Sequence, residues 1–188
     1  MNKFFFGLIV SAVCAGCLSS APKAPTYWLV ESRFAEADRA ARPKFGSVRL
    51  APLVVRAPSD TANFVVLRAD HTVAYDGRNA FAVKPPVMLK NAAEDIAAGS
   101  GLFAAVVPSA SAAAAELSLE VTVDRFAFDC RKSGRRDATA AVSVCLLKGR
   151  EPVACASGEA AVSASGGDYS QAFSQAFTQA LVSALRKL

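Results

Sequence analysis

The chain has 188 residues, of which 53% are hydrophobic and 20% charged, with 21 lysines and arginines against 16 acidic residues. This length suits one domain with a sizeable core. The positive excess is modest and mostly scattered, which argues against a nucleic-acid-binding protein. After Cys17 no hydrophobic stretch reaches the roughly 20 residues that a membrane-spanning helix needs.

The N-terminus is typical of a secretory signal peptide that ends before Cys17. Lys3 supplies the positive charge, the stretch 4–13 is apolar, and Ala15-Gly16 supplies the small residues of a cleavage site. Cleavage directly before a cysteine resembles the processing site of bacterial lipoproteins, where the new N-terminal cysteine is lipidated. Secretion without a lipid is the alternative. We therefore expect a signal peptide at 1–16, lipidation of Cys17, a lipidated tether at 17–26 and a single domain at 27–188.

The first part of this domain has the pattern of two strands and a hairpin. Aromatic and branched residues predict a strand at 27–30. A second strand is expected at 47–56, and because Pro52 interrupts it, this strand should lie at a sheet edge or contain a bulge. Alternating apolar residues predict a hairpin at 63–76, and the sequence Asp-Gly-Arg-Asn at 76–79 is typical of a turn.

One helix and a run of strands are expected in the middle of the chain. Pro85-Pro86 suits the first turn of a helix, and apolar residues continue at helical spacing to residue 98. In the strand expected at 116–130, the apolar residues change from one face to the other at Asp124-Arg125, which indicates a β-bulge. The strands are expected at 102–107, 116–130, 137–147 and 153–164.

Three cysteines remain beyond the expected lipidation site: Cys130, Cys145 and Cys155. Matching the apolar faces of the last two strands places Cys145 opposite Cys155. Directly paired residues in a ladder have Cα atoms roughly 4.5 to 5.5 Å apart, which is within disulfide reach. We expect a disulfide between them, and two unpaired thiols on a half-buried face is the alternative.

The chain ends in a helix with an unusual repeat. It begins at Tyr169 after an Asp168 N-cap. Large apolar residues recur every four positions from Tyr169 to Leu185, with alanines at 172, 176, 180 and 184. Such a helix should be buried broadly, with the alanines allowing close approach to a sheet; offering apolar surface to a partner subunit is the alternative. Two helices on one face of a mixed, mostly antiparallel sheet define an α+β fold.

No catalytic or metal-binding constellation is apparent. His71 beside Asp70 could suggest a small hydrolase, but a lone histidine in a polar turn is usually a surface residue, and no GxSxG elbow or second histidine accompanies it. P-loop, HExxH and metal-spaced patterns are missing from the sequence. We expect no catalytic residue, cofactor or metal. A basic cluster is expected to form a solvated loop, with anionic-lipid contact as the alternative: Arg131, Lys132, Arg135 and Arg136.

Several short motifs along the chain share a known pattern. They are Tyr27-Trp28-Leu29 soon after Cys17, Val48-Arg49-Leu50-Ala51-Pro52, Phe64–Arg68, Val73-Ala74-Tyr75, the aromatic Phe81 before the first helix, and the terminal amphipathic helix. On these residues the chain resembles the ABC-type transport auxiliary lipoproteins, which include the lipoprotein component of the paraquat-inducible system. It differs where the family typically has a tryptophan, at Phe81, and where it has a Tyr-Leu pair, at 57–60.

The resemblance implies a non-catalytic accessory subunit of an envelope lipid-transport system. The resemblance also implies its partners: an ABC permease and ATPase, and a periplasmic protein of the mammalian-cell-entry type. Leu18 after the lipidated cysteine favours the outer membrane, with the domain facing the periplasm. The alternative is an oligomerising envelope assembly or secretion lipoprotein unrelated to lipid transport, and a homo-oligomer is possible in either case.

Overall fold

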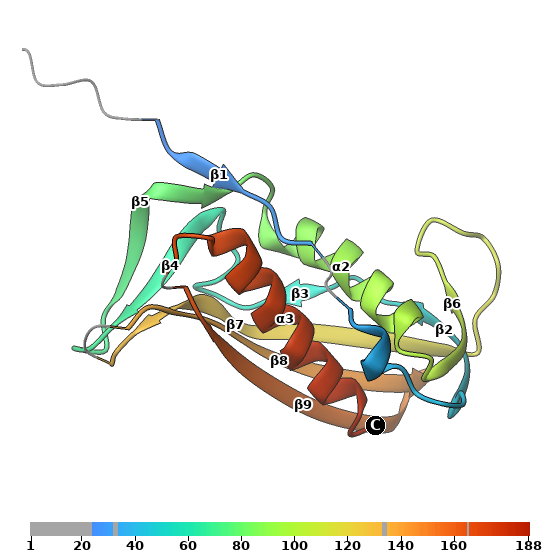
Figure 1. The fold of residues 1–188 in the computed structure, drawn as a ribbon. Coiled ribbons are helices and arrows are strands. Elements are labelled where there is room, and N and C mark those ends of the chain that lie inside the picture. The colour runs from blue at the N-terminus through green and yellow to red at the C-terminus, as the bar shows by residue number, and fades with distance from the viewer. Residues whose placement is uncertain (1–23, 32–33, 133–134, 165) are drawn as a thin grey trace, which may run out of the picture.

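The structure is a computed structural model that describes residues 24–31, 34–132, 135–164 and 166–188 (Figure 1). Within these residues nine strands form one mixed sheet, and helices α2 (Pro85–Gly99) and α3 (Tyr169–Leu185) lie on the same face of it. The α+β architecture expected from the sequence is therefore confirmed. The expected signal peptide 1–16 and the expected lipidation site Cys17 lie outside the described residues.

Strand β7 (Leu117–Cys130) is the centre of the sheet. One of its edges pairs antiparallel with β8 (Asp137–Lys148), which pairs in turn with β9 (Glu151–Ser163). Its other edge is shared by three short parallel strands in succession: β2 (Phe45–Leu50), β3 (Val54–Val55) and β4 (Asn63–Arg68). The long antiparallel ladders make most of the sheet antiparallel. The register shifts between Val123 and Arg125, which confirms the expected bulge.

Pro52 interrupts a strand that lies inside the sheet. β2 has β7 on one side and β6 (Phe103–Val107) on the other, so of the two expected alternatives, a sheet edge or a bulge, the edge is wrong. Leu50 pairs with Leu119 and Val54 pairs with Thr122. Four residue steps on this side of the ladder therefore match three in β7. This extra residue is the bulge that the proline predicted, and at a bulge a missing N–H removes no ladder hydrogen bond.

The turn expected at 76–79 is also wrong, because β5 (Val73–Phe81) continues through it with a bend (Figure 1). Residues 73–75 and Ala80 pair with β4, with a register shift between them, and residues 79–81 also pair in parallel with β1 (Thr26–Trp28). The Asp76 carboxylate makes turn-like hydrogen bonds, accepting from Arg78 N at 2.8 Å and Asn79 Nδ2 at 3.0 Å. Pairing of the residues on both sides of 76–78 keeps β5 continuous in spite of this local turn preference.

The core lies between the two helices and the sheet, and Phe173 of α3 is at its centre. Its fully buried ring packs against rings from β4, β5 and β7 at centroid distances of 4.6 to 5.2 Å: Phe64, Phe81, Phe126 and Phe128. The Asp168 carboxylate accepts a hydrogen bond from Gln171 N at 2.9 Å, so the expected N-cap is confirmed. The aromatic and alanine columns of α3 are both buried, apart from the half-buried Tyr169.

The backbone of α3 packs closely against β9 at Gly158. A Cβ there would contact Ala180 O and lie 2.7 Å from Ala184 N, both backbone atoms of α3. The alanine column leaves no room for a larger side chain between the helix and the strand. This is the close approach that the small residues of α3 predicted.

We expect Gly158→Ala to lower the free energy of unfolding by about 1–3 kcal/mol, because backbone atoms have to move to admit the methyl group. Urea denaturation measures this difference. The matched control is Gly77→Ala, since nothing lies within 4 Å of a Cβ built at Gly77. Equal stability of the two variants would contradict the close packing of α3 on β9.

Candidate functional site

The two helices give the molecule two distinct ends. Both run from the end that carries β1 toward the end that carries the short 3-10 helix η2 (Glu36–Asp38) and the C-terminus (Figure 1). At the β1 end, Ser170 Oγ donates to Leu29 O at 2.5 Å. At the η2 end, Arg186 is paired with Asp38. We refer to these as the β1 end and the η2 end.

A chain of polar contacts fastens β1 to the rest of the domain. Trp28 Nε1 donates to Asn79 Oδ1 at 2.9 Å, and Asn79 Nδ2 donates to Asp76 Oδ2 at 3.0 Å. Arg136 Nη2 donates to the same Asp76 oxygen at 2.8 Å. The Arg136 guanidinium also lies 4.0 Å from the centroid of the Phe128 ring and 4.9 Å from that of Tyr169. β1 is thus connected through β5 to Arg136, directly before β8, and to Tyr169 of α3.

This contact changes the interpretation of the basic cluster. Arg131 and Arg135 are exposed, as expected of a solvated loop, and each pairs with an aspartate two residues away. The hydrogen bond from Arg131 lowers the pKa of Asp129 to about 2. Arg136 is half-buried against aromatic rings instead, so the expectation of a solvated loop is wrong for this residue.

Asp76 is held in its charged form by its partners. Burial acts to raise the pKa of this carboxyl, but hydrogen bonds from Arg136, Arg78 and Asn79 outweigh that effect and leave the pKa below its ordinary value. An ionised carboxylate beside a guanidinium is the favourable state of such a half-buried pair. The contact is therefore a structural clamp on β1 in the present geometry.

The residues that a hydrolase would need are placed on an exposed hairpin turn. His71 is exposed and has a φ of 63°, which confirms its expected surface position. The Asp70 carboxylate accepts from Thr72 N at 3.0 Å and Thr72 Oγ1 at 2.7 Å, and these bonds lower its pKa. Within the described parts of the chain, no cluster of three or more His, Cys, Asp or Glu residues could hold a metal ion. Nor does the described structure include a helix with the length and apolarity required to cross a membrane.

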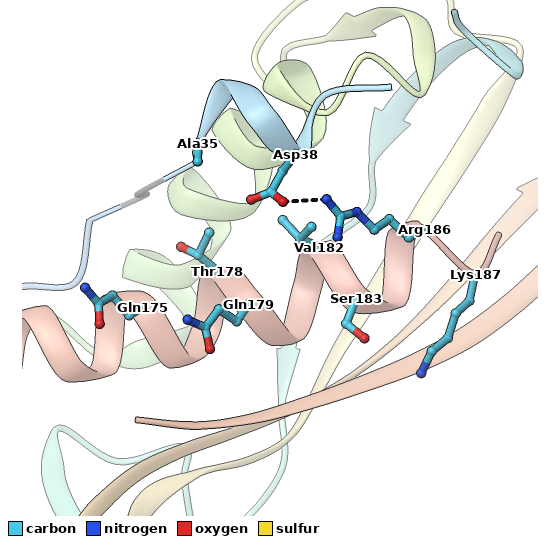
Figure 2. A pocket seen from close by; sticks show the side chains of 9 residues that line it. All are labelled: Ala35, Asp38, Gln175, Thr178, Gln179, Val182, Ser183, Arg186 and Lys187. Atoms are coloured by element: carbon cyan, nitrogen blue, oxygen red, sulfur yellow. Dashed lines mark hydrogen bonds and ion pairs between the residues drawn. The ribbon is translucent and has the colours of Figure 1, made fainter. Parts of the chain in front are cut away.

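A groove of about 610 Å³ lies along α3 toward the η2 end. Gln175, Gln179 and Ser183 succeed one another on the helix, and the Asp38–Arg186 pair lies at one end (Figure 2). Lys187 Nζ donates to Ser157 O of β9 at 2.6 Å and so fixes the C-terminus beside the groove. Amide side chains both donate and accept hydrogen bonds, which suits the backbone groups of a partner polypeptide. We call these residues, with Thr178, the α3 groove.

The expectation that α3 is buried broadly did not include this groove. The signal for it is the polar repeat Gln171, Gln175 and Gln179, which recurs every four residues as the aromatic column does. The same drift around the helix that brings the phenylalanines onto the sheet carries the glutamines along the opposite side. A period of four therefore marks both the buried and the open side of α3.

The disulfide candidates lie on the outer hairpin of the sheet. Cys145 and Cys155 are directly paired in the β8–β9 ladder, as the register analysis predicted. The structure joins them by a disulfide, with Cα atoms 4.2 Å apart. Cys130, at the end of β7, is a free and half-buried cysteine among the described residues. Burial raises the pKa of its thiol.

Alkylation under non-reducing conditions tests this pairing. We expect denatured mature protein to show one reactive thiol, at Cys130, because the structure bridges Cys145 and Cys155 and Cys17 is the expected lipidation site. In the folded protein Cys130 should react slowly at neutral pH, since the thiolate is the reactive form. Mass spectrometry of the labelled peptides gives the count. Labelling of Cys145 and Cys155 without reductant would contradict the bridge.

Comparison with known proteins gives information about the fold alone. No family model and no curated protein matches the chain. Among solved structures, a Xanthomonas campestris protein described as DUF330 is 22% identical, with a TM-score of 0.61 over 85% of this chain and 87% of that one. A structure described as an uncharacterized protein is 13% identical, with a TM-score of 0.59 over 86% of this chain and 94% of that one. These two likenesses show that the fold is shared.

Proposed function

We propose that the chain is a non-catalytic, membrane-anchored periplasmic subunit of an ABC-type transport system for lipids or hydrophobic solutes. In this role it docks a partner of the mammalian-cell-entry type at the outer membrane. The observation that carries the proposal is the separation of the two ends. The chain leads from Cys17 into β1 at one end, while the polar groove of α3 lies toward the other.

The positions behind the family resemblance support the proposal because they hold the fold together. Trp28 fastens β1 through Asn79. Phe81 belongs to the aromatic core, with its ring centroid 4.4 Å from that of Phe64 and 5.3 Å from that of Phe126. A phenylalanine therefore fills the place where the family typically has a tryptophan, so this departure leaves the fold intact.

The length of the tether supports docking close to the membrane. From residue 17 to residue 26 the chain takes nine steps, which span at most roughly 30 Å when fully extended. An acylated Cys17 would hold the domain stably at a bilayer. Because α3 has 17 residues at about 1.5 Å each, the far end of the groove, at Arg186, lies roughly one helix length from the β1 end.

Affinity purification from the native envelope tests the proposal. Wild-type protein should be recovered with the membrane fraction and should co-purify a mammalian-cell-entry protein and an ABC permease. Cys17→Ala should leave the membrane fraction. A variant with Gln175→Arg and Gln179→Arg should remain in the membrane but lose its partners, because two guanidinium groups would obstruct the groove.

Gln171→Arg is the matched control, since it changes the same residue type on the same helix outside the groove. It should retain the partners. A wild-type purification that recovers neither a mammalian-cell-entry protein nor a permease would contradict the proposal. So would a folded Cys17→Ala protein that supports transport from a soluble periplasmic pool.

The oligomerising alternative is favoured by one observation, the outer edge of β9. Among the described strands β9 pairs with β8 alone, and it is 13 residues long. Glu151 and Pro152 lie at its start, but from Val153 to Ser163 it has a single charged residue, Glu159, whereas exposed edges are usually protected by charges or prolines. Native mass spectrometry of the mature protein should show oligomers if this edge is used, and a monomer at all concentrations would exclude it.

A further inference from the structure

A second groove, of about 300 Å³, lies at the β1 end between residues 29–31 and α2. Its apolar end is formed by Leu29, Val83 and Val87, whose exposed fractions are 49%, 41% and 58%. Tyr27, which is 62% exposed, lies two residues before Leu29. We call these four residues the β1 patch. Large apolar side chains that gather at one exposed place mark an interaction site.

The backbone directs these side chains outward. Successive residues of an extended chain point to opposite sides. Trp28 and Val30 point inward, with the Trp28 ring 5.3 Å from that of Tyr169 and Val30 buried. Tyr27 and Leu29 consequently share the outer side. The exposure of the patch is thus a result of the same alternation that anchors β1.

The groove also has a polar end, and this gives it a direction. On α2 the exposed groove residues after Val87 are Asn91 and Asp95, each four positions farther from the β1 end. Glu31 lies at the same polar end. Lys84, next to Val83 in sequence, is exposed. Along the groove the residues are therefore apolar near β1, with Lys84 beside them, and polar and acidic farther away, as at a membrane interface, where anionic headgroups meet acyl chains.

We infer that the β1 patch rests on the lipid bilayer as a second membrane contact beside the acylated Cys17. The inference relies on the proposed function for the position of the anchor. β1 begins nine residues after Cys17, so the patch is the described part of the domain that the tether keeps near the bilayer. Tyr27 and Lys84 suit the headgroup region, and the valines and Leu29 suit the outer part of the acyl chains. The contact would orient the domain with the η2 end toward the periplasm.

Trp28 provides a local probe, because it is the single tryptophan of the chain and is adjacent to two residues of the patch. Mature lipidated protein would be reconstituted in phosphatidylethanolamine and phosphatidylglycerol vesicles with brominated acyl chains. We expect quenching of Trp28 fluorescence, and reduced quenching for a variant with Leu29→Ser and Val87→Ser. The control variant, with Tyr75→Ser and Val153→Ser, removes apolar groups of similar exposure, 56% and 51%, outside the patch and should be quenched like wild type.

A second measurement makes the test independent of the anchor. Cys17→Ala protein should float with the same vesicles weakly, and adding Leu29→Ser and Val87→Ser should lower its partition coefficient about tenfold or more, because apolar area is lost from the contact. An unchanged partition coefficient overturns the inference. So does a photo-cross-linker at position 87 that captures a protein instead of lipid in intact envelopes. If wild-type protein shows the expected Trp28 quenching but co-purifies no transporter, the result contradicts the proposed function and leaves the membrane contact standing.

Discussion

Phe173→Ala is expected to lower the free energy of unfolding by about 3–5 kcal/mol. The ring is fully buried and is surrounded by four phenylalanine rings from β4, β5 and β7. Because these neighbours belong to different strands of one sheet, they cannot all move inward to fill the cavity. Domains of this kind are stable by about 5–15 kcal/mol, so the variant should lose a large part of its stability.

Urea denaturation followed by circular dichroism measures the change. The control is Tyr75→Ala, which removes an aromatic ring that is 56% exposed and should alter stability by about 0.5 kcal/mol or less. A loss of less than about 1 kcal/mol for Phe173→Ala would mean that α3 is not the central layer of the core. The difference between the two variants separates burial from aromatic character.

The parts of the fold that the sequence predicted are those coded by local patterns. The phase change at Asp124 located the bulge of β7, and Asp168 located the start of α3. The pairing of Cys145 with Cys155 followed from two adjacent strands joined by a short turn, where the register is fixed by alternation. In each case the information lies within a few residues of the feature, so no tertiary contact is needed to interpret it.

The errors occur where distant strands decide the conformation. Nothing in the sequence of 47–56 shows that β6 and β7 lie on either side of β2, so Pro52 left a sheet edge and a bulge as alternatives, and only the bulge is found. The 76–79 segment has turn residues, yet pairing of the residues on both sides of 76–78 with β4 and β1 keeps β5 continuous. These are cases in which long-range pairing overrides a local preference.

The candidate sites were predictable to different degrees. In α3 both the large apolar residues of the core and the glutamines of the groove repeat every four positions. Which of the two columns faces the sheet depends on packing. Arg136 could not be distinguished from Arg135 by sequence, because both belong to one basic cluster. The distinction arises from the bend of β5, which brings Asp76 to within hydrogen-bonding distance of Arg136. The clamp on β1 is therefore a property of the fold.

Arg136→Met is expected to lower the free energy of unfolding by about 2–3 kcal/mol at neutral pH. Methionine keeps much of the apolar packing against Phe128 and Tyr169, but it leaves the half-buried Asp76 carboxylate without its cationic partner. Removing one member of a fully buried pair costs about 3–5 kcal/mol, and the 31% exposure of the Arg136 side chain reduces that cost through solvent screening. The control is Arg135→Met, whose 60% exposed side chain pairs with Asp137 at 3.3 Å and should contribute about 0.5 kcal/mol or less.

The pH dependence of this difference identifies Asp76 as the group involved. Its folded pKa lies below the ordinary value of 3.8, so its contribution to stability is present above pH 3.8 and is lost as the pH falls through the folded pKa. Without Arg136 the folded pKa rises, and the acid-linked loss becomes smaller. The gap between wild type and Arg136→Met should thus be constant above about pH 5 and narrow below pH 3.8, while Asp70 and Asp129 titrate alike in both proteins and cancel. A gap that stayed constant down to pH 2 would mean that ring packing alone, and not the ion pair, makes Arg136 stabilising.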